Sequence, residues 1–196
     1  LDNFKPRQIL ISAVHVGAVR KEYLQKLMDK QVTALGFEFI EAPDGSIPFM
    51  SMMSEIAGVT SIHIAGEYLS GHQGGQGLLL GGITGVPPTV VTIIGAGTVG
   101  LHAARTALGL GATVRIIDTE VYKLRHFEER LGTKIYTALS LPDYVEAAVV
   151  TADVVIGAAY HHARRAPCVV TENMVARMRS GSVIVDVSID QGGCIE

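Results

Sequence analysis

Cysteine, charge and long hydrophobic runs are all scarce in this sequence of 196 residues. Its two cysteines, Cys168 and Cys194, form no CxxC pair, which argues against a zinc knuckle or a disulfide scaffold and favours reduced thiols in a cytoplasmic protein. Charged residues make up 18% of the chain and the net charge is -3, so we expect neither a nucleic-acid-binding surface nor a polybasic membrane anchor. No apolar run reaches the roughly 18 residues that a membrane-spanning helix needs.

The ends of the sequence lack two further features. Residues 1–5 do not have the pattern of a signal peptide, and the chain carries no initiator methionine. The chain also stops shortly after the glycine pair at 192–193. We therefore expect a fragment of a longer polypeptide.

Glycine and apolar residues, by contrast, are plentiful. The chain has 22 glycines without a fixed period and only 7 prolines, which excludes collagen and argues against disorder. Hydrophobic residues make up 48% of the chain, enough to bury a sizeable core. The length suits one or two domains.

The first 48 residues predict a β-α-β unit. The apolar run at 9–16 predicts a strand, the helical spacing over 19–30 a helix, and the run at 32–40 a second strand. Strands joined through a helix are expected to be parallel. A helix over 50–69 then predicts a connection to a second domain.

From residue 90 onwards, predicted strands and helices alternate. Strands are expected at 90–94, 113–118, 134–138, 154–158 and 182–187, and helices at 98–109, 121–131, 142–151 and 171–178. Because these strands are almost entirely apolar, they predict a parallel sheet covered on both faces. The expected class is α/β: a Rossmann-type, doubly wound parallel sheet over 71–196, a linking helix over 49–70, and a partial α/β substrate domain over 1–48.

A glycine motif follows the strand at 90–94 and opens the next helix. It reads Gly95-Ala96-Gly97-Thr98-Val99-Gly100. Gly95 would allow the tight turn, Gly97 would let the backbone approach a pyrophosphate, and Gly100 would let the helix pack close to the strand. The start of the helix would add N–H groups and a positive dipole end for the phosphates.

An aspartate completes this dinucleotide-binding pattern. Asp118 ends the following strand, 21 residues beyond Gly97. A carboxylate there would accept hydrogen bonds from the adenosine ribose and repel a 2′-phosphate, which favours NAD over NADP. Two alternatives stay open: a glycine turn that binds nothing, and a Rossmann domain for FAD or S-adenosylmethionine.

A second candidate lies beyond the strand at 182–187. Asp190, close to the glycine pair at 192–193, would place a carboxylate near the nicotinamide, since ligands of open α/β sheets sit outside the carboxyl ends of the strands. From the residues alone, an aspartate without a catalytic role is the usual interpretation of this position. His15 would likewise be interpreted as a packed strand histidine.

Four segments together resemble the alanine dehydrogenase family. They are MSEIAG at 53–58, GGITGVPP at 81–88, the glycine motif at 95–100, and GSVIVDVSIDQGGC at 181–194, the most specific of the four. The resemblance implies a cytoplasmic two-domain enzyme that interconverts L-alanine and pyruvate, with ammonia and NAD(H). It also implies a homo-oligomer, commonly a hexamer assembled through the helix at 50–69, and no metal.

The resemblance implies roles for individual residues. His15 would be the acid/base near the substrate carbonyl, and Asp190 would activate water for attack on the imine. Further cofactor contacts are implied at nine positions besides the glycines and Asp118: Ser54, Thr98, Val99, Lys123, Ser140, Ala159, Tyr160, Val187 and Ile189. Substrate-anchoring Arg and Lys residues would precede residue 1, so we expect this chain alone to bind NADH weakly and to show no turnover.

One segment departs from the family pattern. A loop like VPGAKAP is usual, whereas residues 160–167 read YHHARRAP. A metal site at His161 and His162 is disfavoured because neighbouring side chains on an extended chain point in opposite directions. The default interpretation of the segment, with Arg164 and Arg165, is a solvated basic loop; an altered cofactor or subunit contact is the alternative.

Two other functions compete with the dehydrogenase. One is the related NAD-binding subunit of proton-translocating transhydrogenase, and the other is a non-enzymatic module that senses NAD(H). Transhydrogenase subunits usually lack an aspartate at the position of Asp190, and a sensor needs neither His15 nor Asp190. These two residues therefore favour the dehydrogenase.

Overall fold

A computed structural model describes residues 3–14, 19–160 and 165–196 of the chain. The chain divides into two compact units, Leu1–Met53 and Ser54–Glu196. The long helix α2 (Pro48–Leu69) begins in the first unit and continues into the second. The expected division into 1–48, 49–70 and 71–196 stays a prediction.

The N-terminal unit contains a pair of parallel strands. β1 (Ile9–Ser12) and β2 (Thr33–Gly36) are joined through α1 (Lys21–Asp29). Both strands are shorter than the predicted runs at 9–16 and 32–40. β2 ends where a 3-10 turn (Phe37–Phe39) begins, and this turn brings the Glu38 carboxylate to the backbone N–H of Val14, 2.8 Å away.

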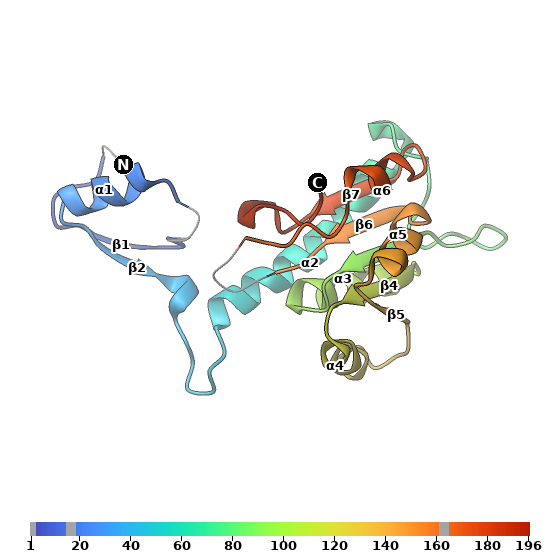
Figure 1. The fold of residues 1–196 in the computed structure, drawn as a ribbon, viewed down its shortest axis with the longest axis horizontal. Coiled ribbons are helices and arrows are strands. Elements are labelled where there is room, and N and C mark those ends of the chain that lie inside the picture. The colour runs from blue at the N-terminus through green and yellow to red at the C-terminus, as the bar shows by residue number, and fades with distance from the viewer. Residues whose placement is uncertain (1–2, 15–18, 161–164) are drawn as a thin grey trace. The chain divides into compact units, whose positions relative to one another are not determined.

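The C-terminal unit is built on a five-stranded parallel sheet (Figure 1). Its strands are β3 (Val90–Ile94), β4 (Thr113–Asp118), β5 (Tyr136–Leu139), β6 (Val154–Gly157) and β7 (Val183–Asp186). Their order across the sheet is β5-β4-β3-β6-β7, so the chain moves outwards from β3 first to one side and then to the other. This reversal creates the crevice in which doubly wound sheets bind ligands, at the carboxyl end of β3.

Helices cover both faces of this sheet. Alternate strand residues point to opposite faces. Ile93 packs with α2, α3 (Thr98–Gly109) and α4 (Val121–Leu131), whereas Ile94 packs with α5 (Pro142–Val150) and α6 (Glu172–Ala176). The prediction of a doubly wound parallel α/β fold is therefore confirmed.

Most predicted elements of this unit match the structure closely. β3, α3, β4 and α4 have the predicted bounds, and the remaining strands and helices differ by one to two residues at one or both ends. α6 begins after Thr171, whose side chain caps the helix by accepting a hydrogen bond from the N–H of Met174.

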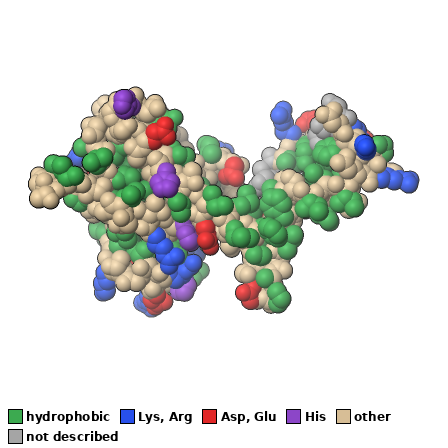
Figure 2. All heavy atoms as spheres, turned by 180° about the vertical axis from the view of Figure 1, so that it is seen from behind, with side chains coloured by type: hydrophobic (Ala, Val, Ile, Leu, Met, Phe, Trp, Pro, Cys, Tyr) green, Lys and Arg blue, Asp and Glu red, His purple; other side chains and the backbone are tan. Residues whose placement is uncertain are grey.

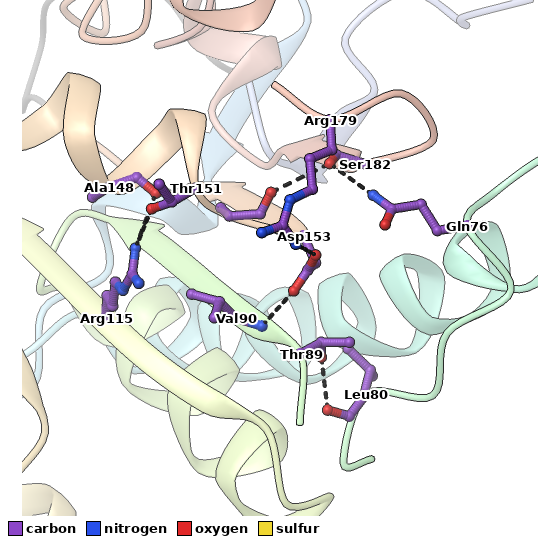
Figure 3. A network of polar contacts seen from close by, with 11 residues as sticks. Gln76, Leu80, Thr89, Val90, Arg115, Ala148, Thr151, Asp153, Arg179 and Ser182 are labelled. Carbon is purple, nitrogen blue, oxygen red and sulfur yellow. Dashed lines mark hydrogen bonds and ion pairs between the residues drawn. The ribbon is translucent and has the colours of Figure 1, made fainter. Parts of the chain in front are cut away.

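A buried aspartate fastens the amino ends of the central strands (Figure 3). The Asp153 side chain accepts a hydrogen bond from the N–H of Val90 at 2.8 Å and forms an ion pair with Arg179 at 3.2 Å. The residue is only 4% exposed, so these partners compensate a charge that would otherwise be costly to bury. Asp153 thus joins β3 to β6 at the end of the sheet opposite the crevice.

The N-terminal unit leaves much apolar surface exposed. Ile9 and Ile11, on one side of β1, are 63% and 67% exposed, and Leu35 on β2 is 50% exposed. Figure 2 shows hydrophobic side chains on the visible surface of this unit. Nowhere in the described ranges does a helix combine the length and the apolar character required to traverse a lipid bilayer.

Candidate functional site

The glycine motif forms the turn from β3 into α3. Gly95 has a φ of +116°, and a Cβ at this residue would lie 2.4 Å from the carbonyl oxygen of Ala158. A Cβ at Gly100 would lie 2.1 Å from the carbonyl oxygen of Gly95. Packing within the protein therefore requires both of these glycines.

Gly97 differs from its two neighbours in the motif. It is exposed, and no protein atom lies within 4 Å of the position that a Cβ would occupy. The fold itself does not require a glycine here, so the open space is available to a ligand. Gly97 is also the N-cap of α3 and provides no capping side chain, which leaves N–H groups of the first helical turn available to an anion.

Asp118 lies beside this turn and contacts it directly. Its Oδ2 accepts a hydrogen bond from the N–H of Ala96 at 2.8 Å, and its Oδ1 accepts one from the N–H of Glu120 at 3.0 Å. The Thr119 hydroxyl donates to Oδ1 as well, at 3.4 Å. A carboxylate offers about four acceptor positions, so capacity is left for a ribose hydroxyl. Sequence spacing predicted the ribose contact but not the bond to Ala96, which ties β4 to the glycine turn.

Three charged or polar side chains gather next to Asp118. Lys123 Nζ lies 2.5 Å from Glu120 Oε1. This pairing raises the pKa of Lys123 and lowers the pKa of Glu120, and the charge of Asp118 raises the pKa of Lys123 further. A hydrogen bond with Glu120 raises the pKa of Tyr122. Lys123, an expected cofactor contact in the first turn of α4, is thus held as a cation by Glu120 and Asp118.

The other expected cofactor positions on the sheet follow the carboxyl ends of its strands. The N–H of Ser140, after β5, donates to the carbonyl of Asp118 at 2.9 Å. Ala159 and the exposed Tyr160 follow β6, and the N–H of Val187, after β7, donates to the carbonyl of Gly157 at 2.8 Å. The topology therefore brings these positions to the same edge of the sheet as the glycine turn.

The remaining predicted contacts surround the start of α3. Thr98 and Val99 form its first turn and are half-buried. Helix α2 passes close to this turn, because a Cβ at Gly58 would lie 2.4 Å from the carbonyl oxygen of Val99. Ser54 is also half-buried and precedes Gly58 by one turn of α2.

Of the two predicted catalytic residues, the structure describes Asp190 only. Asp190 lies in a short 3-10 turn (Ile189–Gln191) after β7, where both it and Ile189, which is 68% exposed, face solvent. His15 lies outside the described residues. The structure therefore places Asp190 at the carboxyl edge of the sheet, and the catalytic roles of Asp190 and His15 stay predictions.

The divergent loop is described only in part. His161, His162, Ala163 and Arg164 lie outside the described residues. The side chain of Arg165 donates to the carbonyl of Gly192, with Nη2 at 3.2 Å. This contact connects the segment after β6 to the loop that carries Asp190, a connection that the sequence did not predict.

A cavity of about 470 Å³ lies elsewhere in the same unit, between α2 and the edge strand β7. Its walls include Ile64, Tyr68, Gln73 and Ser182. It does not include the glycine turn. Within the described ranges, no group of three or more His, Cys, Asp or Glu side chains is arranged to hold a metal ion.

This protein is a Rossmann-type α/β protein. Its strand order, its open glycine turn and the aspartate that ends β4 define this class. A family model confirms and narrows this class, because "Alanine dehydrogenase/PNT, C-terminal domain" matches residues 61–196. The chain belongs to the alanine dehydrogenase/PNT family. The family expected from the four sequence segments is thereby confirmed.

Individual relatives agree with this assignment. The chain is 42% identical to alanine dehydrogenase 2 of Staphylococcus aureus, strain USA300, over 193 residues, which cover 98% of this chain and 52% of that protein. It is 44% identical to alanine dehydrogenase of Staphylococcus epidermidis over 193 residues, again 98% of this chain and 52% of the relative. The chain thus spans about half the length of these curated relatives.

Solved structures show the same fold. An L-alanine dehydrogenase superposes with a TM-score of 0.90 at 42% identity, covering 100% of this chain and 54% of that one. A transhydrogenase from Sinorhizobium meliloti superposes with a TM-score of 0.82 at 24% identity, covering 100% of this chain and 57% of that one, and supports the fold alone.

Proposed function

We propose that the protein carrying this chain is an NAD-dependent dehydrogenase that interconverts L-alanine and water with pyruvate and ammonia. This chain would supply the NAD-binding domain. The single observation that carries the proposal is the Asp118 carboxylate, which is bonded to the glycine turn beside the open space at Gly97. The names of the relatives, which are alanine dehydrogenases, support the choice of substrate.

The residues present fit a dinucleotide. The open space at Gly97 would admit a pyrophosphate against the backbone, and the start of α3 would donate N–H groups to it. Asp118 would hold the adenosine ribose, and its charge would disfavour the 2′-phosphate of NADP. When bound, NAD supplies the acceptor for the hydride that leaves the Cα of alanine.

Asp190 is proposed to handle the water that follows hydride transfer. Loss of the hydride from the amine leaves a protonated imine, and water must add to its carbon and lose a proton before ammonia can leave. An exposed carboxylate at the sheet edge can orient this water and accept its proton. His15 is proposed as the second acid/base, because an imidazole with a pKa of about 6.5 exchanges protons readily near neutral pH.

Two other functions predict different behaviour. A transhydrogenase subunit would bind NADH without oxidising alanine, and a sensing module would do the same without any hydride transfer. The exposed Asp190 favours the dehydrogenase, since neither alternative uses it. We also propose that the protein is cytoplasmic and homo-oligomeric, as expected from the family resemblance.

The decisive experiment is an assay of alanine-dependent NADH formation by the full-length protein that carries this chain. We expect turnover by the wild type, a large loss of kcat in Asp190→Asn, and retained NADH binding in that variant. A fluorescence titration should show tighter binding of NADH than of NADPH. Absence of alanine oxidation by the wild type would refute the proposed activity.

A further inference from the structure

The loop that carries Asp190 is attached to a neighbouring aspartate. Asp186 is the last residue of β7. Its Oδ1 accepts a hydrogen bond from the N–H of Ser188 at 2.9 Å, and its Oδ2 accepts bonds from the N–H groups of Cys194 at 2.9 Å and Ile195 at 3.2 Å. One carboxylate therefore binds three backbone donors.

These donors lie at the two ends of the loop. Ser188 precedes Asp190 and is 7% exposed, whereas Cys194 follows it and is fully buried. The carbonyl of Ser188 also accepts hydrogen bonds from the N–H groups of Gln191 and Gly193, at 2.9 and 3.0 Å. Asp190 is thus carried on a closed turn whose two ends are both held by Asp186.

Asp186 is half-buried and lines the cavity beside β7, but on the side of β6 it is closely packed. A Cβ at Gly157, on the adjacent strand β6, would lie 2.8 Å from Asp186 Oδ1 and 2.8 Å from Cys194 Sγ. Burial raises the pKa of the Cys194 thiol, which therefore keeps its proton and faces Asp186 Oδ1 at 3.7 Å. Because Gly157 has no side chain, there is room for the Asp186 carboxylate. The bonds from Ser188, Cys194 and Ile195 set the orientation of that carboxylate.

We propose that Asp186 is a positioning residue, which holds the 188–195 loop so that Asp190 meets the substrate in the correct geometry. The inference rests on the proposed function, because it assigns Asp190 to the imine step. Asp186 itself is directed at backbone N–H groups and acts through Asp190. Misplacing a reacting group by about 1 Å can reduce a rate about 100-fold, so a loop of this kind needs firm attachment.

The test is Asp186→Asn in the full-length protein. An amide keeps one acceptor oxygen but replaces the other with an NH₂ group that cannot accept from backbone donors. We expect kcat for alanine oxidation to fall about 10- to 100-fold, with the Kd of NADH nearly unchanged. Hydrogen exchange at the amides of Cys194 and Ile195 should become faster.

Asp153→Asn is the matched control. Asp153 also accepts a backbone N–H bond with its carboxylate, but it does so at the amino ends of the strands. If the loss at Asp186 only reflected weaker folding, kcat per folded molecule would stay at the wild-type value in Asp186→Asn. If it reflected a general effect of removing a bonded carboxylate, both variants would lose kcat per folded molecule to a similar extent. Either result would overturn the inference. We expect only Asp186→Asn to lose it.

A second variant, Gly157→Ala, tests the same role if Asp186→Asn folds poorly. Gly157→Ala keeps the Asp186 carboxylate but places a methyl group against it, and the same loss of kcat with retained NADH binding is expected. An active wild type with fully active Asp186→Asn or Gly157→Ala would refute the positioning role alone. A wild type without alanine oxidation would instead refute the proposed function, and the positioning role with it.

Discussion

Asp118 shows how a single carboxylate can serve both the fold and a ligand. It ends β4, bonds the N–H of Ala96 in the glycine turn, and has acceptor capacity left for a ribose. The residue that would recognise the cofactor therefore also shapes the turn that would bind its phosphates. Ribose and pyrophosphate binding would therefore be coupled through this one side chain.

Asp118→Asn should weaken cofactor binding. The amide oxygen can still accept from Ala96, but the bond from the N–H of Glu120 is lost with the second oxygen, and so is the negative charge. A hydrogen bond to a charged group contributes about 1.5–3 kcal/mol, so we expect NADH affinity to fall roughly 10- to 100-fold. The preference for NADH over NADPH should also shrink. Paired fluorescence titrations measure both quantities, and an unaltered preference would contradict the assignment.

The two cysteines should differ sharply in reactivity. Cys168 is exposed, whereas Cys194 is buried, and burial raises the pKa of its thiol above the ordinary value. Because the thiolate is the nucleophile, iodoacetamide at pH 8 should label Cys168 in the folded protein and Cys194 only after unfolding. Peptide mass spectrometry distinguishes the two sites.

The raised pKa also predicts a dependence of stability on pH. Between the ordinary thiol pKa and the raised one, the folded protein holds a proton that the unfolded chain releases. The stability contributed by Cys194 is therefore complete below this range and is lost as the pH rises through it. In the labelling experiment with iodoacetamide, equal modification of both cysteines of the folded protein at pH 8 would show that the Cys194 thiol is not protected.

Much of the site could be predicted from residue spacing, but its internal bonds could not. The pattern identified the residues that follow the carboxyl ends of the strands, such as Asp118 and Asp190, because parallel strands all end at one edge. It did not identify the Ala96 bond of Asp118 or the role of Asp186. The direction of a carboxylate depends on which backbone donors lie across the sheet, and the sequence contains no local signal for that.

At the level of whole elements, the βα turn combines glycines of two kinds. Gly95 and Gly100 are required because backbone atoms already occupy the space of their side chains. Gly97 has open space around it and an ordinary φ of −86°. The same motif therefore separates into positions that serve packing and a position that would serve the ligand.

Gly97→Ala and Gly100→Ala should consequently fail in different ways. Gly97→Ala should lower the Tm only slightly, since alanine is a poorer N-cap than glycine. It should lose NADH binding, because its methyl group would fill the space of the pyrophosphate. Gly100→Ala should lower the stability by about 1–3 kcal/mol, because α3 must move away from β3. Thermal unfolding and NADH titration of both variants test this distinction. Strong NADH binding by Gly97→Ala would show that the open space is not the phosphate site.

The sequence predicted the elements of the C-terminal unit better than those of the N-terminal unit. Buried apolar strands bounded by glycine turns have a clear pattern, and β3 and β4 matched their predictions. The apolar run at 32–40 did not continue as a strand. Its second half forms the 3-10 turn, and Phe37 packs against Phe49 with ring centroids 5.9 Å apart. An apolar run alone does not show whether its side chains pack across a sheet or around a turn.

At the scale of the whole molecule, the two units differ in how much core they contain. Among the described hydrophobic side chains of the N-terminal unit, only Val14 and Leu27 are buried, whereas the C-terminal unit buries two large clusters. Small units of this kind bury too little apolar surface to be very stable by themselves.

Hydrogen exchange of the 196-residue chain should therefore show two levels of protection. Amides of β1 and β2 should exchange at least about 100-fold faster than those of β3 and β6, because a local opening exposes the former and global unfolding is needed for the latter. Mass spectrometry of proteolytic fragments measures both sets. Equal protection would show that the two units unfold as one.

The position of Asp153 has a consequence for the history of such proteins. The buried Asp153 carboxylate that joins β3 to β6 lies at the amino ends of these strands, remote from the loops that would meet cofactor and substrate. Substitutions accumulating in those loops leave the fastening intact. A lineage built on this scaffold can therefore change its specificity through those loops at little cost in melting temperature.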